Sequence, residues 1–172
     1  MIRRTLAVSA ALAATAVLVT SCAGTAVRPV QTGATSITPD AAKHAVTAFV
    51  DRSTAVLGGD WTPRGGAGLS PCTTGDGDDR VSWVLIVDRP AGDDPHADVD
   101  AIERMWKQRG VTTERYQSGG ADPIVGARGA GGPTASVDFY ADPRGYALTG
   151  ESECAEGDYA DMVRRQGDAT AG

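Results

Sequence analysis

The chain has 172 residues, of which 41% are hydrophobic and 22% are charged, and its formal net charge at pH 7 is −6. This length and composition are typical of one globular domain with a single modest core. The charge balance excludes nucleic acid from the expected partners, because a phosphate backbone requires a basic surface and the 22 acidic residues outnumber the 16 basic ones.

The N-terminal segment has the pattern of a signal peptide. Arg3 and Arg4 precede an apolar stretch over residues 6–19 that only two hydroxyl residues interrupt. An apolar run of about 14 residues is too short for a permanent membrane-spanning helix, which needs roughly 18 or more. We therefore expect this segment to direct export and then to be removed.

The run Val19-Thr20-Ser21-Cys22 resembles the lipobox of bacterial lipoproteins, in which an aliphatic residue and two small residues precede the modified cysteine. The resemblance implies cleavage before Cys22, a thioether-linked diacylglycerol on its sulfur, and acylation of the new amino group. Two or three such chains give stable residence in a bilayer surface. We expect a lipid-anchored protein on the extracytoplasmic face of the cell membrane; a secreted protein with an incidental Cys22 is the alternative.

Composition divides the chain into four parts. The signal peptide over residues 1–21 is followed by the lipidated cysteine and a flexible tether over residues 22–37, which is rich in Thr, Ala, Gly and Ser. A single extracytoplasmic domain is predicted over residues 38–166, and residues 167–172 have the composition of a disordered tail. Loss of the two arginines with the signal peptide would change the net charge from −6 to −8, which favours solubility of the exported domain.

Two helices are predicted in this domain. Thr38 is an N-cap before Pro39, and apolar residues then recur at steps of three and four up to Gly58-Gly59. A second helix is predicted over residues 95–109, with Asp94 as its N-cap. The expected buried stripes are Ala42, Val46, Phe49, Ser53 and Val56 in the first helix and Val99, Ile102, Met105 and Trp106 in the second.

The remaining pattern is that of strands and turns. Residues 81–87 are apolar on both faces, as in a central strand, whereas residues 60–80 have the glycine, proline and acidic residues of a long loop. Further segments are predicted as a strand over 111–116, a strand or loop over 124–127, a connection over 129–133, and a hairpin of strands over 135–141 and 146–154. This order indicates an α+β fold with a mostly antiparallel sheet of about four to five strands, two helices packed on one face, and one disulfide.

The disulfide follows from the number of cysteines. Once Cys22 is assigned to lipid, Cys72 and Cys154 remain, and the compartment outside the membrane permits their oxidation. Closing the 82 residues between them would, in the chain-entropy model, stabilise the fold by about 4.5 kcal/mol. A pair of reduced thiols is the alternative, and it would reopen a metal or nucleophile role.

No pattern in the chain predicts catalysis. Serine nucleophiles need a base, and the two histidines, His44 and His96, are both expected at solvent-exposed helix positions. No Gly-x-Ser-x-Gly motif is present, and the predicted disulfide would occupy the two later cysteines. The chain is therefore not expected to be an enzyme.

Metal and cofactor sites are likewise not expected. The acidic stretch over residues 93–100 holds several carboxylates, but Asp98 and Asp100 point about 200° apart on a helix and Asp94 is explained as a cap. The acidic turn at Asp76, Asp78 and Asp79 lacks the glycine of a calcium loop. The glycine-rich segment over residues 126–132 has neither the lysine of a P-loop nor dinucleotide-binding spacing.

Three aromatic residues are the candidates for partner binding. Trp61 lies in the predicted loop, and Tyr140 and Tyr146 flank the turn of the predicted hairpin. Period-two alternation places Tyr140 on the polar face, opposite Phe139, so one interpretation is that Tyr140 forms an exposed, partner-binding aromatic patch with Trp61; core packing is the alternative.

In its alanine-rich and glycine-rich composition, lipobox, late disulfide and final segment over residues 145–154, the chain resembles small actinobacterial lipoproteins of the LppA-type group. This resemblance implies a location and a fold class, with no chemistry. We expect a monomeric, non-enzymatic binding or envelope-interaction domain whose partner is an envelope protein or lipid. The alternatives are a lipid or glycolipid carrier with an apolar cavity and a small envelope hydrolase or metal-dependent enzyme.

Overall fold

The computed structural model describes residues 36–75 and 79–170. The predicted signal peptide, Cys22 and nearly all of the predicted tether lie outside the described residues. None of the described helices is long and apolar enough to cross a membrane.

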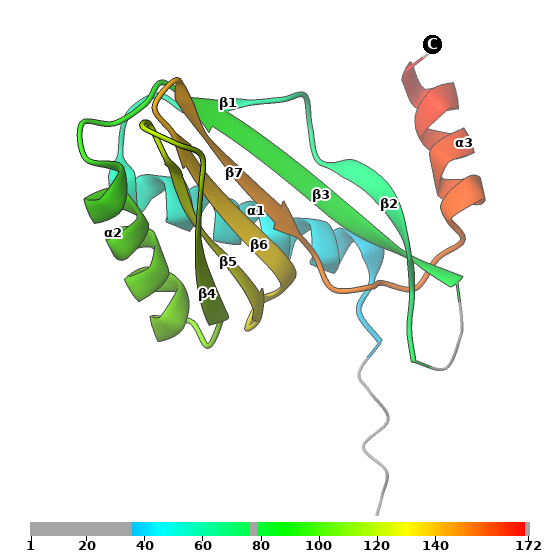
Figure 1. The fold of residues 1–172 in the computed structure, drawn as a ribbon. Helices are drawn as coiled ribbons and strands as arrows, with labels where there is room; N and C mark the ends of the chain where they lie inside the picture. The colour runs from blue at the N-terminus through cyan, green and yellow to red at the C-terminus, as the bar shows by residue number, and fades with distance from the viewer. Residues whose placement is uncertain (1–35, 76–78, 171–172) are drawn as a thin grey trace, which may run out of the picture. The chain divides into compact units, whose positions relative to one another are not determined.

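The described residues form three helices and a seven-stranded sheet in which every pairing is antiparallel (Figure 1). The strand order is β1-β3-β7-β6-β5-β4, and β2 also pairs with β3. The elements in chain order are α1 (Pro39–Leu57), β1 (Thr62–Pro63), β2 (Gly68–Thr73), β3 (Asp79–Arg89), α2 (Pro95–Gln108), β4 (Thr112–Ser118), β5 (Ile124–Gly131), β6 (Thr134–Asp142), β7 (Gly145–Glu151) and α3 (Tyr159–Thr170).

The predicted fold of four to five strands and two helices is wrong, because the sheet has seven strands and the described chain has three helices. The two missed strands, β1 and β2, lie in the segment predicted as a loop. Pro63 and Pro71 disfavour a strand prediction for that segment. Within the described residues, however, β1 and β2 each pair with β3 alone, at one edge of the sheet. An edge strand tolerates proline because the missing N–H can face away from the ladder. β5 also extends to Gly131, into the segment predicted as a connection.

The third helix, α3, was not predicted because it has few apolar residues. Asp158 caps its start, since the Asp158 carboxylate accepts from the N–H of Asp161 at 2.8 Å. Met162 packs against the core from this helix, whereas Tyr159 and Val163 are exposed. An acidic cap followed by apolar residues at this spacing is the signal that could have identified α3.

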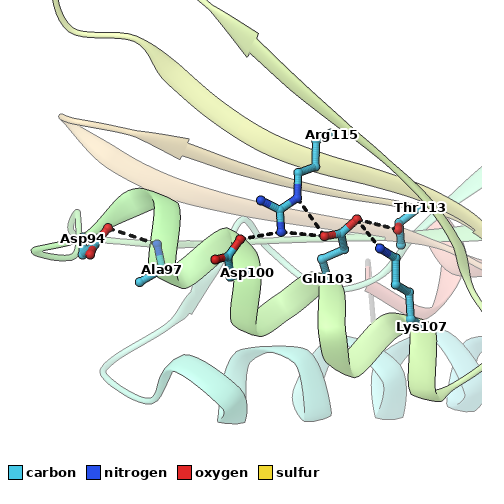
Figure 2. Close-up of polar contacts among 7 residues, drawn as sticks. All are labelled: Asp94, Ala97, Asp100, Glu103, Lys107, Thr113 and Arg115. Carbon is cyan, nitrogen blue, oxygen red and sulfur yellow. Dashed lines mark hydrogen bonds and ion pairs between the residues drawn. The ribbon is translucent and has the colours of Figure 1, made fainter.

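Both predicted N-caps are confirmed. The Thr38 hydroxyl accepts from the N–H of Ala41 at 3.3 Å at the start of α1. The Asp94 carboxylate accepts from the N–H of Ala97 at 3.0 Å at the start of α2 (Figure 2). These bonds satisfy N–H groups that the first turn of a helix leaves without a partner.

α1 and α2 cover the same face of the sheet. α1 contacts β3 and β7, and α2 contacts β5 and β6. One row of paired positions on this face runs through Val87, Leu148, Phe139, Ala127 and Arg115. The core that fills the space between helices and sheet includes the fully buried side chains of Val46, Phe49, Ile102, Trp106, Phe139 and Leu148.

A polar network fastens the edge strand β4 to α2 (Figure 2). Glu103 is 8% exposed, and its carboxylate accepts from the Thr113 hydroxyl at 2.8 Å and from Nε of Arg115 at 2.7 Å. Lys107 pairs with the same carboxylate at 2.8 Å, and Asp100 forms an ion pair with Arg115. Lys107, followed by Arg115 and Thr113, lowers the pKa of Glu103 to about 2 despite the opposing effect of burial.

The predicted disulfide is present. Cys72 on β2 is bonded to Cys154 in the segment after β7, with their Cα atoms 6.0 Å apart. The bond joins an edge strand to a segment 82 residues later in the sequence. It therefore closes a loop that contains most of the sheet.

Candidate functional site

The candidate site lies on the sheet face opposite α1 and α2, which we call the open face. Strand pairing places the side chains of this face in three rows. The rows are Asp88, Ala147, Tyr140, Gly126 and Tyr116; Ile86, Thr149, Asp138, Arg128 and Glu114; and Val84, Glu151, Ser136, Ala130 and Thr112. Polar, charged and aromatic side chains therefore dominate the open face, in contrast to the apolar face under the helices.

The first of two hollows on the open face, hollow A, has a volume of about 450 Å³. It spans β4 to β7 near the turn between β5 and β6. Small residues account for much of its lining, with Arg128, Glu114 and Asp138 as the charged groups. The full lining is Thr112, Thr113, Glu114, Arg128, Gly129, Ala130, Ser136, Val137, Asp138 and Thr149.

Tyr116 extends from the edge strand β4 across the open face, over β5 towards β6, and contacts three residues there. Its hydroxyl donates to the Asp138 carboxylate at 2.6 Å, and the Arg128 guanidinium lies 4.9 Å from the centre of its ring. A Cβ at Gly126 would overlap the ring, so only glycine fits beneath it. Burial, and then the bond to Asp138, raises the pKa of Tyr116 far above its usual range. This hydroxyl therefore stays protonated at neutral pH.

The second hollow, hollow B, has a volume of about 390 Å³ and adjoins the turn between β6 and β7. Two arginine–carboxylate pairs line it. Nε and Nη2 of Arg64 donate to Asp88 at 2.5 and 2.8 Å, and the same atoms of Arg144 donate to Asp142 at 2.9 and 2.7 Å. The Tyr140 hydroxyl also donates to Asp142, at 3.1 Å. Arg144 holds the pKa of Asp142 far below its usual range.

The three aromatic candidates occupy different environments. Tyr140 is half-buried on the open face, the face that its alternation with Phe139 predicted, and it also lines hollow B. Tyr146 borders hollow B but is only 2% exposed, and its ring packs edge-on against Phe139 with the ring centres 5.5 Å apart. Burial is the main cause that raises the pKa of Tyr146 to about 12. Tyr146 is therefore mainly a core residue.

Trp61 does not join Tyr140 on the open face. Its ring N–H donates to the carbonyl oxygen of Gly58 at 3.0 Å. The Arg89 guanidinium lies 5.5 Å from the ring centres of both Trp61 and Tyr146 and donates to the carbonyl oxygens of Leu57 and Gly58. Arg89 thus satisfies carbonyl groups at the C-terminal end of α1, and Trp61 packs beside it.

Sequence reasoning missed most of the charged residues of this site. Period-two alternation in residues 135–141 places Asp138 on the same face as Tyr140, so that pattern could have identified it. No local signal pairs Arg64 with Asp88, because 24 residues separate them in the chain.

The residues considered for metal or catalytic roles are either exposed or bonded to other parts of the fold. His44 and His96 are exposed, Asp94 caps α2, and Asp100 pairs with Arg115. Within residues 36–75 and 79–170, no group of three or more His, Cys, Asp or Glu side chains could hold a metal ion.

Comparison with known proteins finds no family model and no curated protein that matches this chain. Among solved structures, the chain is similar to a DUF4853 family protein from Actinomyces odontolyticus, with 17% sequence identity and a TM-score of 0.49. The match covers 69% of this chain and 66% of that protein, so the chain spans just under two thirds of the length of that protein.

Proposed function

We propose that this protein is a non-enzymatic binding domain, anchored through lipid on Cys22 to the extracytoplasmic side of a membrane, and that the open face is its contact surface. The lipobox pattern supports the anchor. The observation that carries the binding role is the open face itself, since α1 and α2 lie on the other side and the open face carries two hollows bordered by polar and aromatic groups.

Two groups of the open face have pKa values that fix their protonation state at neutral pH, which suits a contact surface. General acid–base catalysis is most efficient when a group has a pKa near the working pH. Tyr116 has a pKa raised far above neutrality, and Asp142 has one held far below it. Both groups therefore keep one protonation state at neutral pH and present fixed hydrogen-bonding atoms.

The lipid-carrier alternative requires an apolar cavity between the helices and the sheet. In the described part of the chain, the fully buried side chains of Phe49, Trp106 and Phe139 occupy that space. Both hollows described above lie on the polar side of the sheet. We therefore do not propose a carrier.

Site-specific photo-crosslinking in native membranes tests the proposed contact surface. A photoreactive amino acid is placed in the full-length protein at Tyr140 or Arg128 on the open face, and at exposed Arg52 on α1 as the matched control. We expect crosslinked adducts from the two open-face positions and a much lower yield from position 52. Equal yields from all three positions, or none from the open face, would reject the proposal.

A further inference from the structure

We propose that hollow B binds an uncharged, hydroxyl-rich ligand of the neutral oligosaccharide class. This inference rests on the open face being the contact surface and names its ligand. It follows from one juxtaposition. An aromatic residue on β6 and two arginine–carboxylate pairs border the same hollow, and Ala147 and Gly145 leave space between Tyr140 and the Arg64–Asp88 pair.

The dimensions of hollow B suit one sugar ring at its base. Asp88, Ala147 and Tyr140 are paired neighbours on β3, β7 and β6, so Ala147 forms a low floor between two walls. The outer strands of such a trio are about 10 Å apart. Gly145 adds no side chain on the same stretch of β7. A volume of about 390 Å³ also lies within the range of small-ligand sites.

Charge pairing in hollow B disfavours an ionic ligand. The guanidinium groups of Arg64 and Arg144 each donate two hydrogen bonds to a resident carboxylate. Each guanidinium charge is thereby balanced by a carboxylate, so neither pair offers an uncompensated charge to an ionic ligand. Arg89 borders the hollow as well, but its guanidinium donates to carbonyl oxygens at the end of α1, where the helix dipole is negative.

The hydrogen-bonding capacity that remains suits hydroxyl groups. A guanidinium has five N–H donors, so Arg64 and Arg144 each keep unused donors beside their carboxylate bonds. Asp88 accepts two bonds from Arg64, and a carboxylate has about four acceptor sites. Sugar hydroxyls both donate and accept, so they can use both kinds of group without breaking either pair.

Tyr140 supplies the apolar surface that a sugar ring also requires. Its bond to Asp142 fixes the position of the hydroxyl end, and its neighbour on the β7 side is Ala147. On the β5 side, the Tyr116 ring covers Gly126. On the β7 side, strand pairing places the small Ala147 next to Tyr140 and Asp88 beyond it, which leaves room for the C–H face of a pyranose to stack on the ring.

Saturation-transfer NMR on the full-length protein, in a detergent without a sugar headgroup, tests this assignment. The probes are short neutral oligosaccharides of glucose, mannose, galactose and arabinose, with oligogalacturonate and inorganic phosphate as charged comparators. We expect saturation transfer to at least one neutral probe and none to the charged comparators. Binding of the charged comparators alone, or of no probe, would overturn the assignment.

Three variants locate the binding site. Tyr140→Ala should weaken binding of the neutral probe about tenfold or more through loss of the stacking surface. Tyr140→Phe keeps the ring and should retain most of the affinity, and Tyr159→Ala removes an exposed tyrosine from α3 as the matched control. Thermal unfolding of each variant checks that the fold is intact. An unchanged affinity in folded Tyr140→Ala would contradict the assignment.

The two experiments fail in distinguishable ways. Crosslinks from Tyr140 and Arg128 without binding of any neutral oligosaccharide would retain the open face as contact surface and reject the carbohydrate. An absence of crosslinks from the open face would reject the proposed function, and the assignment of hollow B with it.

Discussion

Substitution of Glu103 with glutamine should destabilise the domain, by an amount that depends on pH. Glu103 is 8% exposed and accepts from Thr113, Arg115 and Lys107. These partners lower its pKa from 4.5 to about 2. Each pKa unit corresponds to 1.36 kcal/mol, so the ionised form contributes about 3 kcal/mol to stability at pH 7. Glu103→Gln removes the charge but keeps one amide oxygen as acceptor, so we expect a loss of about 2–3 kcal/mol.

The sign of the pH dependence follows from the lowered pKa. A carboxyl group with a lower pKa in the folded state contributes fully above its unfolded pKa of about 4.5 and loses this contribution as the pH falls through about 2. The difference between wild type and Glu103→Gln should therefore fall to about 1 kcal/mol at pH 3.

Urea unfolding of both proteins at pH 7 and pH 3, followed by circular dichroism, measures this difference. Arg104→Gln is the control, because Arg104 is an exposed neighbour of Glu103 on the same helix, and we expect it to change stability by less than about 0.5 kcal/mol. An equal loss at both pH values, or a loss at pH 7 no larger than that of the control, would refute the reasoning.

Three further outcomes are expected. Replacement of both Cys72 and Cys154 by serine should lower the free energy of unfolding by about 4.5 kcal/mol through loss of an 82-residue loop closure, measured by urea unfolding. Gly126→Ala should cost about 1–3 kcal/mol because its Cβ overlaps an aromatic ring of β4, whereas Gly66→Ala, which meets nothing within 4 Å, should not lower the melting temperature appreciably. Mass spectrometry of protein from native membranes should find an N-terminus that begins at acylated Cys22. Cys22→Ala should move the protein from the membrane fraction to the aqueous fraction. An unmodified thiol at Cys22 would contradict the anchor.

Local features of the chain were predictable because their physical causes are local. The start of α1 at Thr38 and Pro39, and of α2 at Asp94, follows from side chains that bond to N–H groups within three residues. The hairpin of β6 and β7 follows from alternation of apolar and polar residues on either side of a turn. The pairing of Cys72 with Cys154 follows from the number of cysteines and the expected compartment.

Tertiary structure alone decided where the sheet ends and which side chains meet on its open face. β1 and β2 exist because β3 offers them an edge, which no pattern within their own few residues could indicate. Tyr116 reaches Asp138 only because β5 lies between them with a glycine at the crossing point. Strand pairing links residues far apart in the chain, so the identity of the paired strands, and with it the composition of each hollow, depends on packing of the whole core.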